Sequence, residues 1–254
     1  YDKDVMEDVS KVFATTLSHM INIDKDMTTL VVGLGNWNIT PDALGPKVIS
    51  KLMITRHLRE LVPDKIDENI RPVCALSPGV LGLTGIETGE IIKAVVEKIK
   101  PNLIICIDAL ASRNTERVNK NIQIGNTGIS PGSGIGNKRM EISERTLGIP
   151  VIAIGVPTVV HAITLANDSI DLAIDAFINQ SNSGSEFFKM LNSIDRNEKQ
   201  SLLNEILYPY IGDMFVTPKE IDMDIDVLSK IIAGGINISL QPALDIDEIN
   251  KYTN

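Results

Sequence analysis

Cysteine is scarce in this sequence. The 254 residues include two, Cys74 and Cys106, and both lie in apolar, strand-like runs. Thiols in such runs act as small buried hydrophobic side chains, which argues against a disulfide framework. No C-x-x-C spacing occurs, so a cysteine-based metal site is not expected.

Long apolar runs and an excess of positive charge are also missing. No apolar segment reaches the length of a membrane span, and 24 Lys and Arg face 33 Asp and Glu, for a formal net charge of −9. A net-acidic surface argues against general nucleic-acid binding. The chain starts at Tyr1 without a signal-peptide pattern, which favours a processed form or a fragment of a cytoplasmic protein.

Short apolar runs alternate with segments of helical period along the chain. All-apolar runs are typical of parallel strands buried on both faces. The pattern predicts an α/β fold with a mostly parallel sheet between helices, in one domain over 1–254 with a weak polar linker near 179–186. The predicted strands are 28–34, 73–76, 103–107 and 151–155, the last ended by Pro157; the predicted helices are 1–23, about 41–61 behind Thr40 as N-cap, 88–100, 138–147, 158–177, 186–207 and 219–233.

Two aspartates follow predicted strands and are the main candidates for chemistry. Asp42 lies in the first turn of a helix after the first strand, and Asp108 ends the run Leu103–Ile107. The loops after parallel strands share one edge of the sheet, so the two carboxylates can meet there. A close pair disfavours double ionisation; the ionised member can activate water and the protonated member can protonate a leaving amide nitrogen. For Asp42 alone, interaction with the helix dipole is the alternative.

His161 follows Gly155-Val156-Pro157 and starts the next predicted helix. It could join the same edge as a metal ligand or an acid–base group, or it could be an ordinary first-turn histidine. No H-E-x-x-H motif occurs, which argues against a zinc protease of that type.

Two glycine motifs resemble known sites without their context. Gly33-Leu34-Gly35 lacks the third glycine of a dinucleotide loop, because Asn38 stands there, and Asp42 would repel a pyrophosphate. The match to G-x-S-x-G around Ser130 lies in a glycine-rich loop without the strand and helix that a nucleophile elbow requires. We interpret that match as coincidental.

The segment 114–136 is the longest irregular stretch, with five glycines, and it leads into Lys138-Arg139. A loop this long in a compact domain is more often functional than a plain connection. We expect it to line a substrate cleft or to move as a flap.

Several blocks of the sequence closely resemble the germination protease family of spore-forming Firmicutes. They occur in the same order and lie within a match from about Thr28 to Glu220. The blocks are GLGNWNITPDALGP at 33–46, SPGVLGLTGIET at 77–88, IDALASR at 107–113, ISPGSG at 129–134 and GVPTVV at 155–160.

The resemblance implies an endopeptidase of the spore core that degrades small acid-soluble spore proteins early in germination. It also implies a zymogen activated by autoprocessing, a homotetramer, no cofactor, and a three-layer αβα fold similar to that of hydrogenase maturation proteases. The family's two essential aspartates map onto Asp42 and Asp108. In hydrogenase maturation proteases two acids and a histidine bind nickel of the substrate, and His161 could correspond to that histidine.

The resulting hypothesis is an aspartate-dependent endopeptidase with Asp42 and Asp108 as its catalytic pair. Asn36, Arg113 and backbone N–H groups near the glycines are candidates to orient the pair or stabilise an oxyanion. Ser130 and Ser133 are candidates for substrate binding. Two alternatives stay open: a metal-assisted peptidase that uses Asp42, Asp108 and His161, and a catalytically locked zymogen or binding form.

Overall fold

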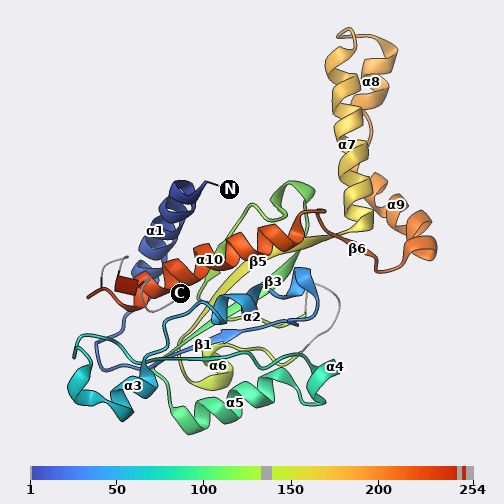
Figure 1. The fold of residues 1–254 in the computed structure, drawn as a ribbon. Helices are drawn as coiled ribbons and strands as arrows, with labels where there is room; N and C mark the ends of the chain where they lie inside the picture. Colours follow the sequence, from blue (N-terminus) through green and yellow to red (C-terminus); the bar gives the residue numbers. More distant parts are fainter. Residues whose placement is uncertain (1, 133–138, 245–247, 250–254) are drawn as a thin grey trace.

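The described residues of the computed structural model, 2–132, 139–244 and 248–249, build a six-stranded, mostly parallel sheet (Figure 1). Four parallel strands stand in the order β2-β1-β3-β5, and β4 and β6 pair antiparallel with β5. This confirms the predicted fold class. The strands are β1 (Thr29–Gly33), β2 (Val73–Leu76), β3 (Leu103–Ser112), β4 (Gln123–Gly125), β5 (Val151–His161) and β6 (Phe215–Val216).

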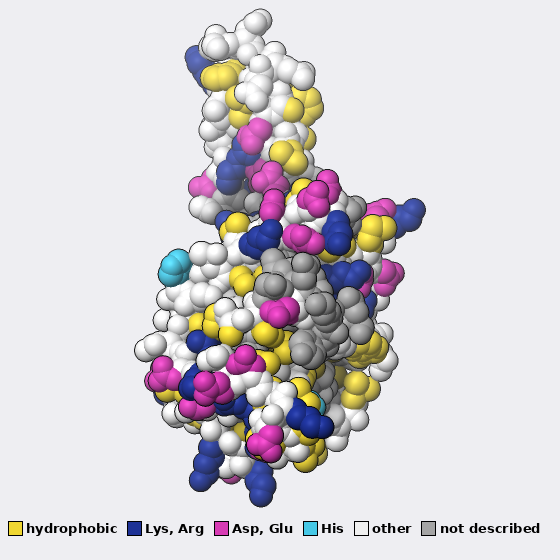
Figure 2. Space-filling model, turned by 60° about the vertical axis from the view of Figure 1, so that its left-hand side comes forward, with side chains coloured by type: hydrophobic (Ala, Val, Ile, Leu, Met, Phe, Trp, Pro, Cys, Tyr) yellow, Lys and Arg dark blue, Asp and Glu magenta, His cyan; other side chains and the backbone are white. Residues whose placement is uncertain are grey.

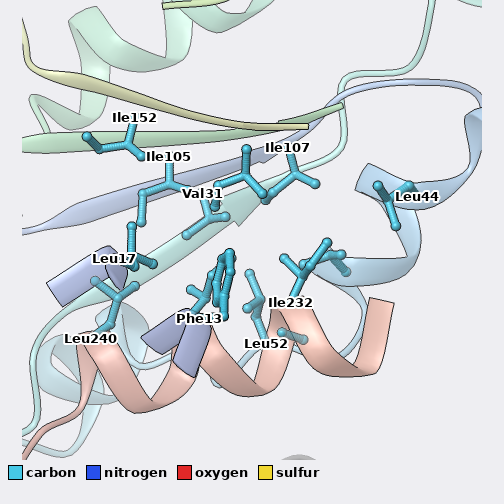
Figure 3. Close-up of a cluster of buried hydrophobic side chains, with 14 of the residues drawn as sticks. Phe13, Leu17, Val31, Leu44, Leu52, Ile105, Ile107, Ile152, Ile232 and Leu240 are labelled. Carbon is cyan, nitrogen blue, oxygen red and sulfur yellow. The ribbon is translucent and has the colours of Figure 1, made fainter. Parts of the chain in front are cut away.

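Helices cover both faces of the sheet because its strands are apolar on both faces. In β1, Val31 points into one core cluster, and Leu30 and Val32 point into the other. The first cluster packs against α1 (Lys3–Met20), α2 (Leu44–Ile49) and α10 (Ile221–Leu240), and Figure 3 shows its side chains filling the space between sheet and helices. The second packs against α5 (Thr88–Ile99) and α6 (Glu144–Leu147). The result is a three-layer αβα body.

Three helices form an arm that projects from this body (Figure 1). The arm comprises α7 (Ala162–Gln180), which continues from β5, α8 (Glu186–Asn192) and α9 (Arg196–Ile211). The polar segment near 179–186 is the turn between α7 and α8. The prediction of a single helix over 186–207 was wrong, because Asp195 caps a new helix by accepting from the backbone N–H groups of Asn197 and Glu198.

The predicted helix over about 41–61 is broken. The 3₁₀ turn η1 (Thr40–Asp42) precedes α2, and α3 (Arg56–Leu61) follows only after a gap; Thr40 makes no side-chain cap. Backbone groups of the segment between α2 and α3 form hydrogen bonds with a residue that is distant in the sequence. The Asn237 side chain accepts from Met53 N at 3.0 Å and donates to Lys51 O at 3.3 Å. The fully buried Thr55 likewise links this segment to the sheet, because its Oγ1 accepts a hydrogen bond from the backbone N–H of Val73 in β2.

Strands β3 and β5 run further than predicted. Asp108 therefore lies within β3, opposite Gly155, and Pro157 lies inside β5. The register shifts between Leu110 and Ala111, opposite Pro157, and this bulge accommodates a residue that cannot donate to the ladder. The next helix consequently begins at 162 instead of 158, and of the predicted helix 138–147 only α6 is formed among the described residues.

The remaining short elements are α4 (Leu81–Thr84), η2 (Pro63–Lys65) and η3 (Thr115–Arg117), and the last of these lies in the long segment predicted to be irregular. Both cysteines are free, Cys106 buried and Cys74 half-buried. Within the described part of the chain, no helix combines the length and apolarity that crossing a bilayer requires.

The turn after β1 closes so tightly that it excludes side chains. Gly35 has φ +111°, and a Cβ placed there would lie 2.0 Å from the carbonyl oxygen of Asp42. A Cβ on Gly33 would lie 2.4 Å from the carbonyl oxygen of Gly45. The glycines that suggested a nucleotide loop thus allow η1 and α2 to pack directly on the end of β1, and this packing fixes Asp42 at the sheet edge.

We expect Gly35→Ala to destabilise the protein by at least about 2 kcal/mol, because it adds a clash to the cost of a positive φ. The matched control is Gly148→Ala, at φ +69° with nothing within 4 Å of the added methyl, for which the conformational cost alone is about 1 kcal/mol. Urea unfolding measures both. Equal losses would contradict close packing at Gly35.

Candidate active site

A cleft opens at the edge of the sheet where the parallel strands β1 and β2 end. Its volume is about 90 Å³, room for about three waters at their liquid volume. Residues from four separate segments meet there. They are Leu34, Gly35 and Asp42 after β1, Gly79, Val80 and Thr88 after β2, Asp108 in β3, and Pro131, Gly132 and Arg139 from the long loop.

Asp42 ends η1 and is held by the turn that Gly35 allows. The backbone N–H of Asn36 donates to its Oδ2 at 2.8 Å and also to its carbonyl oxygen at 3.1 Å. Burial raises the pKa of Asp42 to about 6, and the hydrogen bond from Asn36 opposes that rise. Asp42 can therefore accept a proton close to neutral pH.

Asp108 is the more buried of the two, with 6% of its surface exposed. Burial is the main cause that raises its pKa to about 7; the nearby charge of Asp42 adds to the rise, and the N–H of Ala109, which donates to Oδ1 at 2.9 Å, opposes it. Its strand neighbour is Gly155, which brings no side chain.

The structure thus places Asp42 and Asp108 on one cleft, with electrostatic coupling between them. A coupled pair titrates as a unit, and near pH 6.5 this pair carries about one proton. One ionised and one protonated carboxyl group on a cleft that holds water can provide a general base and a general acid.

The other predicted site residues lie less centrally. The side chain of Asn36 turns into its own loop, where its Oδ1 accepts from Asn38 N at 3.0 Å. Arg113 is exposed and does not line the cleft. Ser130 is half-buried beside the lining residues Pro131 and Gly132 but is not itself part of the lining.

The loop context of Ser130 differs from that of a nucleophile elbow. Its neighbour Ile129 forms an isolated bridge with Ile142, so no strand leads to the serine. This agrees with a coincidental match. Ser133 lies outside the described residues.

Arg139 lines the cleft, although the sequence hypothesis gave the cationic role to Arg113. The sequence signal was its place directly after the long glycine-rich loop, which was expected to line a substrate cleft. Its Nη1 lies 3.4 Å from Glu87 Oε2, and its side chain is 23% exposed. The long loop therefore contributes to the cleft through Pro131, Gly132 and Arg139.

His161 is not a member of the cleft lining. It ends β5 and caps α7, with Nδ1 accepting from Ile163 N at 3.2 Å. Its Nε2 lies 3.9 Å from Asp213 Oδ1, and its ring meets Phe215 edge-on. Over the described ranges, no group of three His, Cys, Asp or Glu side chains could hold a metal ion. The metal-assisted alternative through His161 has no geometric support here.

We expect Asp108→Asn to stabilise the fold at neutral pH. Both folded and unfolded wild-type chains are protonated at this carboxyl group below about pH 4, so the variant gains nothing there. Between about pH 4 and pH 7 the unfolded wild type releases this proton while the folded wild type keeps it. The gain of the variant therefore grows across that window, at about 1.4 kcal/mol per pH unit, and levels off above pH 7 at up to about 4 kcal/mol.

Urea unfolding of both proteins between pH 4 and 8 measures this difference. The matched control is Asp64→Asn, at an exposed carboxylate. A gain for Asp108→Asn that is constant across this range would show that Asp108 ionises as readily in the folded state as in the unfolded state.

Comparison with known proteins places the chain in a family. The family model described as germination protease matches residues 1–191 and 175–253. Among curated relatives, the germination protease of Clostridium tetani is 63% identical over 254 residues, with 100% of this chain and 79% of the relative covered. That of Bacillus velezensis is 44% identical over 287 residues, with 100% and 78% covered.

The solved structures found include a mutant pyrrolidone carboxyl peptidase of the hyperthermophile Pyrococcus furiosus. That protein is 17% identical, with 86% of this chain and 100% of that chain covered, and the TM-score of 0.31 is too low to support an inference. The sequence matches, in contrast, span nearly the whole chain. The chain belongs to the germination protease family.

Proposed function

We propose that this member of the family is an endopeptidase that hydrolyses small acid-soluble spore proteins in the core of the germinating spore, with Asp42 and Asp108 as its acid–base pair. Family membership supports a protease that acts in germination. The observation that carries the mechanism is the pair of buried carboxyl groups, both with raised pKa values, on one small cleft.

The two carboxyl groups have distinct roles in this mechanism. Ionised Asp42 takes a proton from a water molecule as the water oxygen attacks the scissile carbonyl carbon. Protonated Asp108 then gives its proton to the amide nitrogen as the C–N bond breaks. The pair ends with its single proton on Asp42, and transfer of that proton back to Asp108 restores the starting state.

The shape of the cleft fits an internal peptide bond of a flexible chain. Its volume of about 90 Å³ has room for a peptide group and the attacking water. Three exposed apolar residues are close in the sequence to residues that line the cleft. Trp37 and Ile39 lie between Gly35 and Asp42, and Leu81 directly follows Val80. We infer that these side chains contact substrate residues on either side of the cleaved bond.

We expect Asp42→Asn and Asp108→Asn each to lower kcat for a small acid-soluble spore protein by at least about 100-fold, the scale of acid–base catalysis. For the wild type, kcat/KM plotted against pH should be bell-shaped, with limbs near pH 6 and pH 7. A pair that carries two protons has no general base, and a pair that carries none has no general acid. Gel analysis of substrate cleavage at a series of pH values measures both effects.

The single tryptophan provides the control for substrate binding. Trp37 is half exposed on the loop that donates to Asp42, so its fluorescence should change when Asp42→Asn binds uncleaved substrate. Undiminished cleavage by either variant would sink the aspartate mechanism. A wild-type chain that binds substrate in this assay and never cuts it would instead support the locked or binding form.

Autoprocessing of a zymogen follows from the same proposal, because the aspartate pair would also make the activating cut. A longer precursor that carries Asp42→Asn should then keep its N-terminal segment under conditions in which the wild-type precursor loses it. Asp42→Asn therefore tests autoprocessing as well as cleavage of the substrate.

We also propose that the protein assembles as a homotetramer through its arm. Figure 2 shows the arm standing clear of the body, with hydrophobic side chains among charged ones on its surface. Clustered exposed apolar side chains are typical of association sites, and we infer that those of the arm meet other subunits. The large hydrophobic residues exposed on the arm are Leu165, Ile170, Leu172, Phe177, Phe187, Met190, Leu202, Ile206, Tyr208 and Tyr210.

Sedimentation tests this assembly. We expect a tetramer for the wild type and smaller species for the double variant Leu172→Asp/Leu202→Asp, because charges would enter the contact. The control Val12→Asp changes an equally exposed residue of α1 and should remain tetrameric. A wild-type monomer, or a tetramer that survives the double variant, would contradict an interface on the arm.

A further inference from the structure

One lining residue of the cleft has no place in the mechanism above. Arg139 is the only positively charged side chain among the described residues that line the cleft. It lines the same cleft as both aspartates.

The position of Arg139 is set by its neighbours in the chain. Met140 packs so closely on the first turn of α5 that a Cβ on Gly89 would lie 2.8 Å from the Met140 side chain. Two residues further, Ile142 exchanges backbone hydrogen bonds with Ile129 at 2.8 and 2.9 Å. The long loop is thus anchored immediately after Arg139, which lines the cleft.

The guanidinium of Arg139 has donors to spare. Its contact with Glu87 is long, 3.4 Å between Nη1 and Oε2, and in the described part of the chain this is its one hydrogen bond. An arginine carries five N–H donors and stays charged at every working pH. The raised pKa values of Asp42 and Asp108 have burial as their main cause, and neither group takes Arg139 as an ion-pair partner.

We infer that Arg139 binds the oxygen of the scissile carbonyl and stabilises the oxyanion formed during hydrolysis, with Glu87 as the residue that positions it. When the water oxygen bonds to the carbonyl carbon, the π electron pair of the C=O bond moves to oxygen. The guanidinium donates to that charged oxygen. When the electron pair returns, the C–N bond breaks and the nitrogen leaves with the proton from Asp108. This inference rests on the proposed peptidase function.

Kinetics of three variants test this role. Arg139→Gln removes the charge, Arg139→Lys keeps it without the planar fork, and Glu87→Gln removes the positioning partner. The control is Arg117→Gln, an exposed arginine outside the cleft lining. Each is assayed for kcat and KM on a purified small acid-soluble spore protein, with thermal unfolding as the check on folding.

We expect Arg139→Gln to lower kcat by about 100- to 1,000-fold, the range seen when one oxyanion donor is removed, with little change in KM. Arg139→Lys should recover part of that loss because the charge remains. Glu87→Gln should lower kcat by a smaller factor. This effect should vanish in the Arg139→Gln background, because Glu87 then has no guanidinium to position. Arg117→Gln should behave as the wild type.

A raised KM with unchanged kcat in Arg139→Gln would overturn the inference, because it would show binding that is uniform in ground and transition states. Wild-type kinetics of Arg139→Gln would overturn it as well. If Arg139→Gln fails to fold, Arg139→Lys decides: a kcat equal to that of Arg117→Gln contradicts the role, whether or not KM rises. Full activity of Asp42→Asn would sink the aspartate mechanism alone, since charge develops on the carbonyl oxygen in any peptide hydrolysis.

Discussion

The burial of two carboxyl groups on one cleft is the constraint on which the site depends. An ionised carboxylate is costly away from water unless donors or cations compensate it. Among the described residues, the backbone N–H groups of Asn36 and Ala109 donate to the pair. These donors do not outweigh burial, so the pair retains a proton at a pH where exposed aspartates have lost theirs. The same burial that weakens the fold near neutral pH would let the pair act as base and acid in the proposed mechanism.

The backbone around the pair is built to permit this burial. Gly35 lets the chain turn back so that η1 lies on the end of β1. At Gly155, the register partner of Asp108, an added Cβ would lie 2.4 Å from the side chain of Leu110, so this glycine makes room for Leu110 beside the pair. The parallel order β1-β3-β5 then brings segments distant in sequence to one edge. Helices cover both faces of the sheet (Figure 1), so that the carboxyl groups meet water at the cleft and not across the layers.

Sequence reasoning found the parts of this arrangement that rest on local pattern. Apolar runs identified the central strands, and the parallel direction of those strands was enough to predict that Asp42 and Asp108 can meet at one edge. It failed where distant residues decide. Residues after Asp108 continue β3 because β5 offers a partner with a bulge at Leu110, and the helix after Asp42 breaks because Asn237 binds its backbone. Neither partner is visible within a local window.

The choice of the cationic residue shows the same limit. Arg113 stands five positions after Asp108 in the sequence, yet β3 carries it beyond the cleft to an exposed place. Arg139 lies 31 positions from Asp108 and lines the cleft together with Pro131 and Gly132. A strand advances by over 3 Å per residue, so neighbours in sequence need not share a small site.

The central claim is that the aspartate pair holds one proton near neutral pH, and carboxyl-carbon NMR of the protein labelled at aspartate measures this directly. Resonances are assigned through Asp42→Asn and Asp108→Asn. We expect two carboxyl signals that titrate near pH 6 and pH 7, far above exposed aspartates. Titration of both signals near pH 4 would contradict the account, because the pair would then be fully ionised when the enzyme works.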